Sequence, residues 1–201
     1  MCAQSAIGRP AVYWAAGALG WLLAWAGVAL VVCPSTLAAT HGPDILDVQS
    51  DPDGGLRAVA TLHLPVPPSV VQQVLTDYEG WADLFGVQMR LARVDRQPDR
   101  VVTDIYIRHP ILPGERRLMC ENRVPPGGGL VTRILEGDFK RYERVWKLAP
   151  DGSDATKAEF SLVVDVETMA PDWLVALELK RQLEKHFRIL RATTAARATS
   201  H

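Results

Sequence analysis

The chain has 201 residues, of which 48% are hydrophobic and 22% are charged, and its formal net charge at pH 7 is -1. This composition is typical of a globular protein and excludes a disordered or fibrous chain. The charge balance lacks the basic excess of nucleic-acid-binding proteins, so we expect no nucleic-acid partner.

The first 39 residues differ chemically from the rest of the chain. Arg9 precedes an uncharged apolar run at residues 11–32, and a proline and small residues follow, ending at Ala39. This order is typical of a secretory signal peptide. The run is also long enough to cross the core of a bilayer, which is about 30 Å thick. Residues 1–39 are therefore predicted to be either a cleaved signal peptide or a retained N-terminal membrane anchor.

Both alternatives predict an exported protein, either periplasmic or anchored to the membrane and facing the periplasm. A lipoprotein anchor at Cys33 is a third alternative, but Val32 is larger than the residue that usually precedes a lipidated cysteine. If the leader is retained, the membrane becomes a partner of the protein. The sequence leaves the oligomeric state open.

The cysteine count argues against disulfides and metals in the domain. Cys2 and Cys33 belong to the leader, which leaves Cys120 as a single thiol that cannot form an intrachain disulfide. The chain has no CxxC or HExxH motif and no cluster of His and Cys residues. We therefore expect neither a metal site nor another cofactor.

The next residues predict a linker followed by a strand. Residues 40–55 are rich in Gly, Pro and Asp and are predicted to form a linker. Apolar and polar residues alternate over residues 56–64, as in a half-buried strand. Apolar side chains then recur at helical spacing over residues 69–85, where Gly80 predicts a bend between two short helices.

A period of two governs the following segments, and turn residues separate them. Consecutive strands with such short links pair antiparallel. The chain then closes with an amphipathic helix from Pro171 to about residue 191, within a domain at residues 56–192, and residues 193–201 are predicted to be a flexible tail. The predicted strands span residues 87–96, 100–109, 115–124, 130–136, 139–148 and 155–168.

These elements predict an α+β fold, in which a seven-stranded curved antiparallel sheet wraps round the long C-terminal helix. Two short helices follow the first strand. The last helix is the only element long enough to cover one face of the sheet. Because one helix cannot fill the concave side of a curved sheet, we expect an apolar cavity, the usual kind of small-molecule site.

Three segments resemble the START/Bet v 1-like (SRPBCC) superfamily, and specifically its coenzyme Q-binding and polyketide cyclase-like branch. They are PVPPSVVQQVLTDYEGWADLF, RYERVWKLAPDGSDATKAEFSLVVDV and PDWLVALELKRQLEKHFRILR. The resemblance implies a helix-grip fold, and it implies that the cavity binds lipids, isoprenoid quinones, sterols or polyketides.

Aromatic side chains and one methionine are the candidate residues for the lining or entrance of this cavity. Taken singly, each is also compatible with a place in the hydrophobic core. Tyr106 and Tyr142 are of special interest because a phenol facing a cavity needs a polar partner. The full set is Trp81, Phe85, Tyr106, Met119, Tyr142, Trp146, Phe160, Trp173 and Phe187.

Polar residues provide no recognisable catalytic constellation, so we assign no catalytic residue. The pattern favours a partly exposed helix position for His186, while His109 lies before Pro110 at a strand end, where it could border a pocket. Arginines of the middle strands, among them Arg117 and Arg144, are expected on a solvated outer face. The alternatives are a surface for anionic lipids, or one arginine turned inward to hold a ligand carboxylate or carbonyl.

The sequence therefore predicts a binding protein for a hydrophobic small molecule, such as a lipid, quinone, isoprenoid or polyketide-like compound. Its role would be transport or presentation near a membrane. Two alternatives remain open. One is a cyclase- or aromatase-like enzyme acting in the same cavity. The other is a protein–protein adaptor that uses a sheet edge.

Overall fold

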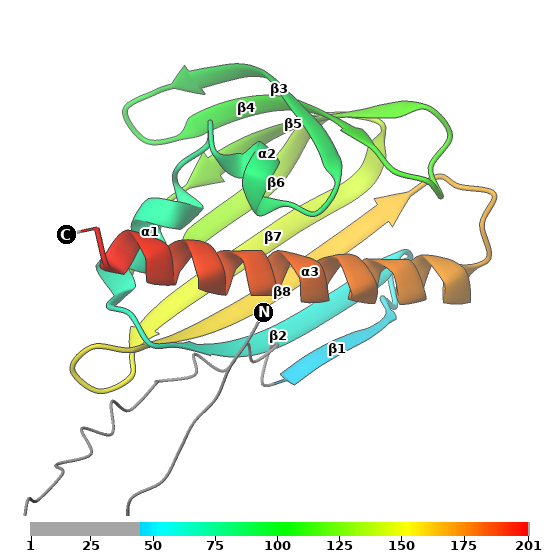
Figure 1. Ribbon diagram of the computed structural model, residues 1–201. Coiled ribbons are helices and arrows are strands. Elements are labelled where there is room, and N and C mark those ends of the chain that lie inside the picture. The colour runs from blue at the N-terminus through cyan, green and yellow to red at the C-terminus, as the bar shows by residue number, and fades with distance from the viewer. Residues whose placement is uncertain (1–44, 201) are drawn as a thin grey trace, which may run out of the picture. The chain divides into compact units, whose positions relative to one another are not determined.

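A computed structural model of the protein describes residues 45–200, and the predicted leader at residues 1–39 lies outside them. The described part begins with two strands, continues with two short helices and six strands, and ends with one long helix (Figure 1). In chain order these are β1 (Ile45–Ser50), β2 (Leu56–Leu64), α1 (Pro68–Leu75), α2 (Trp81–Leu84), β3 (Gln88–Arg96), β4 (Val101–Arg108), β5 (Glu115–Arg123), β6 (Leu130–Gly137), β7 (Phe139–Pro150), β8 (Thr156–Val166) and α3 (Asp172–Ala198).

All eight described strands form one antiparallel sheet, in the order β1-β2-β8-β7-β6-β5-β4-β3. Figure 1 shows the sheet bending around α3, which crosses its concave side. The short helices α1 and α2 both contact α3, and Figure 1 shows α1 beside its C-terminal end. This arrangement confirms the predicted curved antiparallel sheet and long C-terminal helix of the helix-grip fold.

The sheet has eight strands, one more than predicted. The additional strand is β1, which occupies residues 45–50 of the predicted linker and pairs with β2 from Ile45↔Thr61 to Ser50↔Leu56. Although the segment is short and rich in polar residues, Leu46 and Val48 pack against the core. Two apolar residues that face the core, beside an exposed Ile45, are too few for a period to be recognised in the sequence.

The last helix is also longer than predicted, since α3 continues to Ala198 through residues assigned to a flexible tail. Thr194 is buried there, and Arg197 pairs with Asp77 at 2.7 Å. These contacts hold the end of α3 against the segment after α1. No helix among residues 45–200 is both long and apolar enough to cross a membrane.

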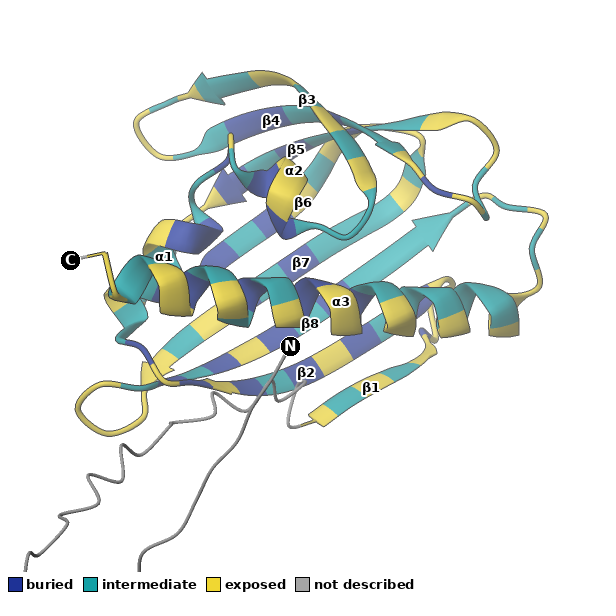
Figure 2. Cartoon of the chain, in the orientation of Figure 1, coloured by how far each residue is buried: buried dark blue, intermediate teal, exposed yellow. Residues whose placement is uncertain are grey.

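The hydrophobic core lies between the sheet and the C-terminal half of α3. Alternate residues of β2 are buried, as the period of two predicts (Figure 2). At the centre, the ring of Phe187 packs edge-on against Trp146 at 5.8 Å and against Phe160 at 5.1 Å between ring centroids. This cluster fixes one half of α3 on the sheet, since every buried residue of the helix lies at Leu183 or beyond.

A glycine turn connects the core side of the sheet to α1. Gly129 has a backbone φ of +93°, and a Cβ atom at this position would collide with the carbonyl oxygen of Trp146. Only glycine fits such a position without strain. The Gln72 side chain donates to the Gly129 carbonyl oxygen at 3.1 Å and accepts from its N–H at 2.6 Å, so α1 is tied to the β6 end of this turn.

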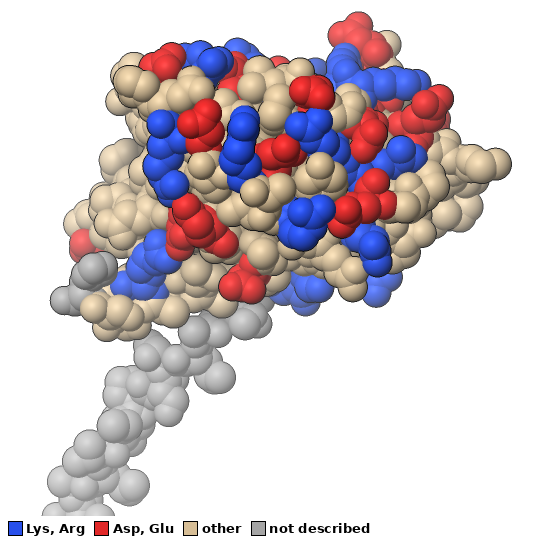
Figure 3. Space-filling model, turned by 90° about the horizontal axis from the view of Figure 1, so that it is seen from above, with Lys and Arg blue, Asp and Glu red and all other residues tan. Residues whose placement is uncertain are grey.

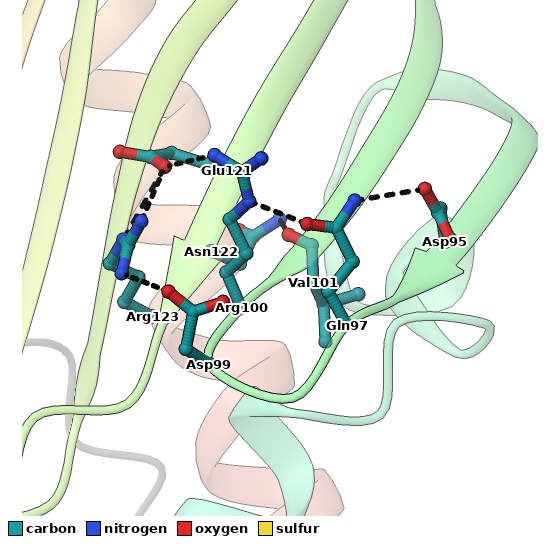
Figure 4. A network of polar contacts seen from close by, with 8 residues as sticks. All are labelled: Asp95, Gln97, Asp99, Arg100, Val101, Glu121, Asn122 and Arg123. Atoms are coloured by element: carbon teal, nitrogen blue, oxygen red, sulfur yellow. Dashed lines mark hydrogen bonds and ion pairs between the residues drawn. The ribbon is translucent and has the colours of Figure 1, made fainter.

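Charged side chains of both signs cover the outside of the molecule. In the face drawn in Figure 3, Lys and Arg side chains lie among Asp and Glu side chains. Ion pairs join strands of the sheet, and near the β3–β4 turn they continue into the polar network of Figure 4, where Glu121 accepts from both Arg100 and Arg123. The solvated outer face predicted for the arginines is therefore present. Pairs that join strands include Arg90–Glu115, Arg117–Asp104 and Arg133–Glu143.

Candidate ligand-binding cavity

A cavity of about 280 Å³ lies between the N-terminal half of α3 and the concave side of the sheet. The sheet contributes residues from β2, β4, β7 and β8, and the segment after α2 contributes Phe85, Gly86 and Val87. Most of the lining is apolar, which suits a hydrophobic ligand. Its apolar members include Ile107, Ile111, Leu112, Phe139, Phe160, Leu162, Val164, Val166, Val175, Leu179 and Leu183.

Two contacts border this cavity where the loop after β4 meets α3 and the segment before it. Nε2 of His109 lies 3.3 Å from a carboxylate oxygen of Glu178 on α3. The Thr168 hydroxyl donates to the Ile111 carbonyl oxygen at 3.0 Å. A ligand that enters here would have to pass between the loop after β4 and α3. We therefore take this rim as the candidate entrance of the cavity.

A smaller cavity of about 60 Å³ adjoins the large one. The two share Phe85, Val87, Ile107, Tyr142 and Arg144, so they lie next to each other, and we call the smaller one, which Trp81 of α2 also lines, the inner end of the cavity. The two parts differ in charge, because Asp165, Asp172 and Glu178 line the large part, whereas no carboxylate lines the inner end. The polar side chains of the inner end come from β4, β6 and β7. Its further lining residues are Trp81, Met89, Thr103, Ile105, Leu118, Cys120 and Thr132.

A row of buried polar side chains crosses the sheet at this inner end, from β4 to β7. Asn122 donates to the Thr103 hydroxyl at 3.0 Å and to the Val101 carbonyl oxygen at 3.1 Å, the latter contact also drawn in Figure 4. The Thr132 hydroxyl donates to the Asn122 side-chain oxygen at 2.8 Å and accepts from Arg144 at 3.3 Å. The row therefore ends on a guanidinium group that lines both cavities.

Arg144 is 4% exposed, and none of the ion pairs within residues 45–200 includes it. Its guanidinium carbon lies 4.7 Å from the ring centroid of Trp81 and 5.0 Å from that of Phe85. Such cation–π contacts offset part of the cost of removing a cation from water. Its Nε is buried without a hydrogen-bond partner in the described part of the chain.

His186 lies on the cavity wall and stays neutral. Its Nδ1 donates to the Leu84 carbonyl oxygen at 3.0 Å, and its ring stacks on Phe85 at 4.5 Å between centroids. Burial, together with the Arg144 charge and against the hydrogen bond to the Leu84 carbonyl oxygen, lowers the pKa of His186 from 6.5 to about 4. Because Nδ1 carries the proton, the buried Nε2 is an acceptor with no partner among the described residues.

The other titratable groups near Arg144 are also neutral at pH 7. Burial raises the pKa of the Cys120 thiol to about 12. Burial likewise raises the pKa of the phenols of Tyr78 and Tyr142 above their usual 10.0. In each case the Arg144 charge opposes the shift. The inner end of the cavity is thus positively charged, with no anion of the described chain beside it.

Four of the predicted site residues lie on the cavity wall. Phe85 and Tyr142 line both parts, Trp81 lines the inner end and Phe160 lines the large part. Trp146 and Phe187 lie instead in the fully packed core next to it, each at most 1% exposed. Sequence patterns alone did not separate these two environments, because both are apolar and lie on the same face of the sheet.

Three further predicted residues, Tyr106, Met119 and Trp173, are placed away from the cavity, which corrects the prediction. Tyr106 lies on the opposite face of β4 from Ile105 and Ile107, and Arg90 covers its ring at 4.2 Å. Met119 pairs with Asp104 on that outer face, where Arg117 contacts its sulfur at 3.7 Å. Trp173 is 69% exposed in the first turn of α3.

Two polar side chains of the cavity wall differ from the positions that the sequence pattern favours. His186 is buried rather than partly exposed, because the segment after α2 folds back over this face of α3. Arg144 faces inward rather than toward solvent, which is the alternative left open for one arginine of the middle strands. Strand alternation predicts this inward direction of Arg144, since Tyr142 and Trp146 lie two residues to either side of it and are both predicted to point inward.

A curved antiparallel sheet that encloses an elongated apolar cavity with one long helix defines a START-like protein of helix-grip fold. The sequence matches the family described as "Polyketide cyclase / dehydrase and lipid transport" over residues 64–186, which is more than half of the chain. The chain therefore belongs to this family.

Solved structures share the fold at low sequence identity. A STAR-related lipid transfer protein from Xanthomonas axonopodis is 14% identical, with a TM-score of 0.57 over 75% of this chain and 98% of that chain. A START superfamily protein from Mycobacterium smegmatis is 16% identical, with a TM-score of 0.56 over 70% and 97%. The Zhui aromatase/cyclase from Streptomyces sp. R1128 is 12% identical, with a TM-score of 0.54 over 76% and 94%. No curated protein sequence matches the chain.

Proposed function

We propose that the protein binds a hydrophobic small molecule in the cavity and carries or presents it near a membrane. The single observation that carries this proposal is the apolar space of about 280 Å³ between α3 and the sheet. A packed core leaves few voids larger than a water molecule, so a space of this size at one end of the molecule indicates a ligand site. Membership of a family described by cyclase, dehydrase and lipid transport activities supports the same class of ligand.

We also propose that the chain is exported by residues 1–39, as a periplasmic protein or one anchored to the membrane. The support is the uncharged run at residues 11–32 after Arg9. Fractionating the source cells and sequencing the mature N-terminus test this directly. We expect either a terminus after Ala38 or Ala39 in the soluble exported fraction or an intact leader in the membrane fraction. An unprocessed chain in the cytosol would contradict export.

Filling the cavity is expected to weaken ligand binding. Val164 lines the cavity from β8, and Val164→Trp places a much larger side chain into it. If a ligand has to overcome an overpacking cost of about 1–3 kcal/mol, the affinity for a neutral hydrophobic dye such as Nile red should fall by about 5- to 150-fold. Fluorescence titration of the purified domain measures the affinity, and thermal unfolding confirms that the variant is folded.

Val163→Trp is the matched control, because Val163 is the preceding residue of β8 and points to the opposite face of the sheet. This variant should bind Nile red as the wild type does. Equal affinity for the dye in the wild type and in Val164→Trp would contradict the cavity as the binding site. Wild-type protein that binds no hydrophobic dye or lipid would contradict the proposed function itself.

A cyclase- or aromatase-like reaction is the second candidate, favoured by the convergence of Arg144, Tyr142 and His186 on one cavity. The pKa shifts weigh against base catalysis there. With a pKa of about 4, His186 is a weak base at pH 7, and the raised pKa of Tyr142 disfavours a phenolate. Binding without proton abstraction therefore fits these groups better.

A further inference from the structure

Arg144 is a buried, inward-facing arginine of the middle strands that lines both parts of the cavity, and its charge has no counter-ion in the described chain. A buried cation without a partner costs several kcal/mol, so proteins rarely keep one without a use. Arg116 shares the inner face, since it pairs with Ile107 in the sheet, but it lines neither part of the cavity. Arginines of the outer face are paired with carboxylates. Arg117 and Arg133, for example, lie on the outer face and pair with Asp104 and Glu143 at 3.0 Å each.

The protein holds this guanidinium group in one place. The Thr103–Asn122–Thr132 row fixes it from one side through a single hydrogen bond, from Nη2 to the Thr132 hydroxyl. The rings of Trp81 and Phe85 cover it from α2 and the segment behind it. A guanidinium group carries five N–H donors, so most of them stay available. They belong to a side chain that lines both parts of the cavity.

None of the titratable side chains whose pKa responds to the Arg144 charge supplies an anion. The phenols of Tyr78 and Tyr142 and the thiol of Cys120 keep their protons at pH 7, since burial raises their pKa values. His186 is uncharged, so it neither neutralises Arg144 nor competes with it for an anion. The charge of Arg144 is therefore open to an incoming group.

We propose that Arg144 forms an oxyanion subsite at the inner end of the cavity, and that the ligand is amphipathic, with an apolar body and an acidic oxygen head group such as a carboxylate. The inference rests on the proposed function and adds to it the chemical class of the ligand. The head group enters first and pairs with the guanidinium group, where carboxylates bind in a bidentate manner. The apolar body then occupies the large part of the cavity, between α3 and residues such as Leu162 and Val164.

Displacement of Nile red by decanoate and by decan-1-ol tests the subsite, because the two compounds share the apolar chain and differ in the head group. Hydrogen bonds to charged groups contribute about 1.5–3 kcal/mol, so the wild type should prefer decanoate by about 10- to 100-fold at pH 7.5. In Arg144→Met the preference should disappear, with the decan-1-ol affinity within about twofold of wild type. Arg144→Lys should retain an intermediate preference, since it keeps the charge and loses the planar fork.

Arg133→Met is the matched control, because it removes the same charge from an exposed site on the outer face. It should leave the preference for decanoate unchanged. A wild type that binds both compounds equally would overturn the subsite while leaving the proposed function standing, and so would a preference that survives in Arg144→Met. If neither compound displaces Nile red and the dye itself does not bind, the proposed function fails. The wild-type comparison needs no variant, so poor folding of Arg144→Met would not prevent the test.

Discussion

Phe187→Ala is expected to lower the free energy of unfolding by about 3–5 kcal/mol, the usual cost of deleting a fully packed aromatic side chain. Phe187 is 0% exposed and contacts Trp146 and Phe160 edge-on, so its removal leaves a void that the sheet cannot fill. A domain of this size has a total stability of about 5–15 kcal/mol, so the loss is a large fraction of it. Chemical denaturation followed by circular dichroism measures the change.

Leu177→Ala provides the control within the same helix. Leu177 is 58% exposed in the N-terminal half of α3, so its truncation should change the stability by no more than about 0.5 kcal/mol. Similar losses in the two variants would contradict the placement of the core under the C-terminal half of the helix. The pair of variants therefore tests the orientation of α3 on the sheet as well as the contribution of one ring.

Acidification is expected to destabilise the protein through His186. The imidazole is neutral in the folded state with a pKa of about 4, whereas a histidine in an unfolded chain has its ordinary pKa of about 6.5. As the pH falls from 6.5 to 4, the unfolded state binds the proton first, so the free energy of unfolding decreases. A shift of this size corresponds to about 3 kcal/mol, fully present as stability above pH 6.5 and lost below pH 4.

His186→Asn should remove this part of the pH dependence. An asparagine amide can still donate to the Leu84 carbonyl oxygen, the bond that His186 forms through Nδ1, and it does not titrate in this range. Urea unfolding of the two proteins at pH 7, 6, 5 and 4 gives the comparison. Parallel curves across these pH values would show that His186 is not the group responsible.

Much of the fold was predictable because local patterns and turn chemistry agree along most of the chain. The alternation in β2 and the Gly and Pro residues between later strands predict the succession of strands along the chain, and the amphipathic stripe predicts α3. The exceptions depend on distant contacts. β1 exists because β2 offers an edge to pair with, and α3 continues past residue 191 because Thr194 is buried there and Arg197 pairs with Asp77 after α1. A single sequence does not show either partner.

The site was only partly predictable, because aromatic character was taken as the signal for a residue that lines the cavity. Alternation within β4 already placed Ile105 and Ile107 on one face and Tyr106 on the other. The same rule applied to β7 puts Arg144 on the face of Tyr142, against the usual expectation for an arginine. A polar residue at an inward-facing strand position therefore indicates the cavity wall better than a large apolar residue does. What no pattern could show is that α2 and Phe85 would close over this charge.

The uneven burial of α3 has a consequence for the motions of the molecule. The first helical turns bear Trp173 and Leu177 in solvent and cover a space rather than a packed core, whereas Phe187, Leu190 and Thr194 are buried. Local opening of a segment costs less where it disrupts fewer packed contacts. Amide hydrogens of the first turns should therefore exchange with solvent orders of magnitude faster than those after Leu183, and the gradient should flatten when the cavity is filled. We therefore expect a ligand to enter by opening of the first turns of α3, while the packed core around the C-terminal half of the helix stays folded.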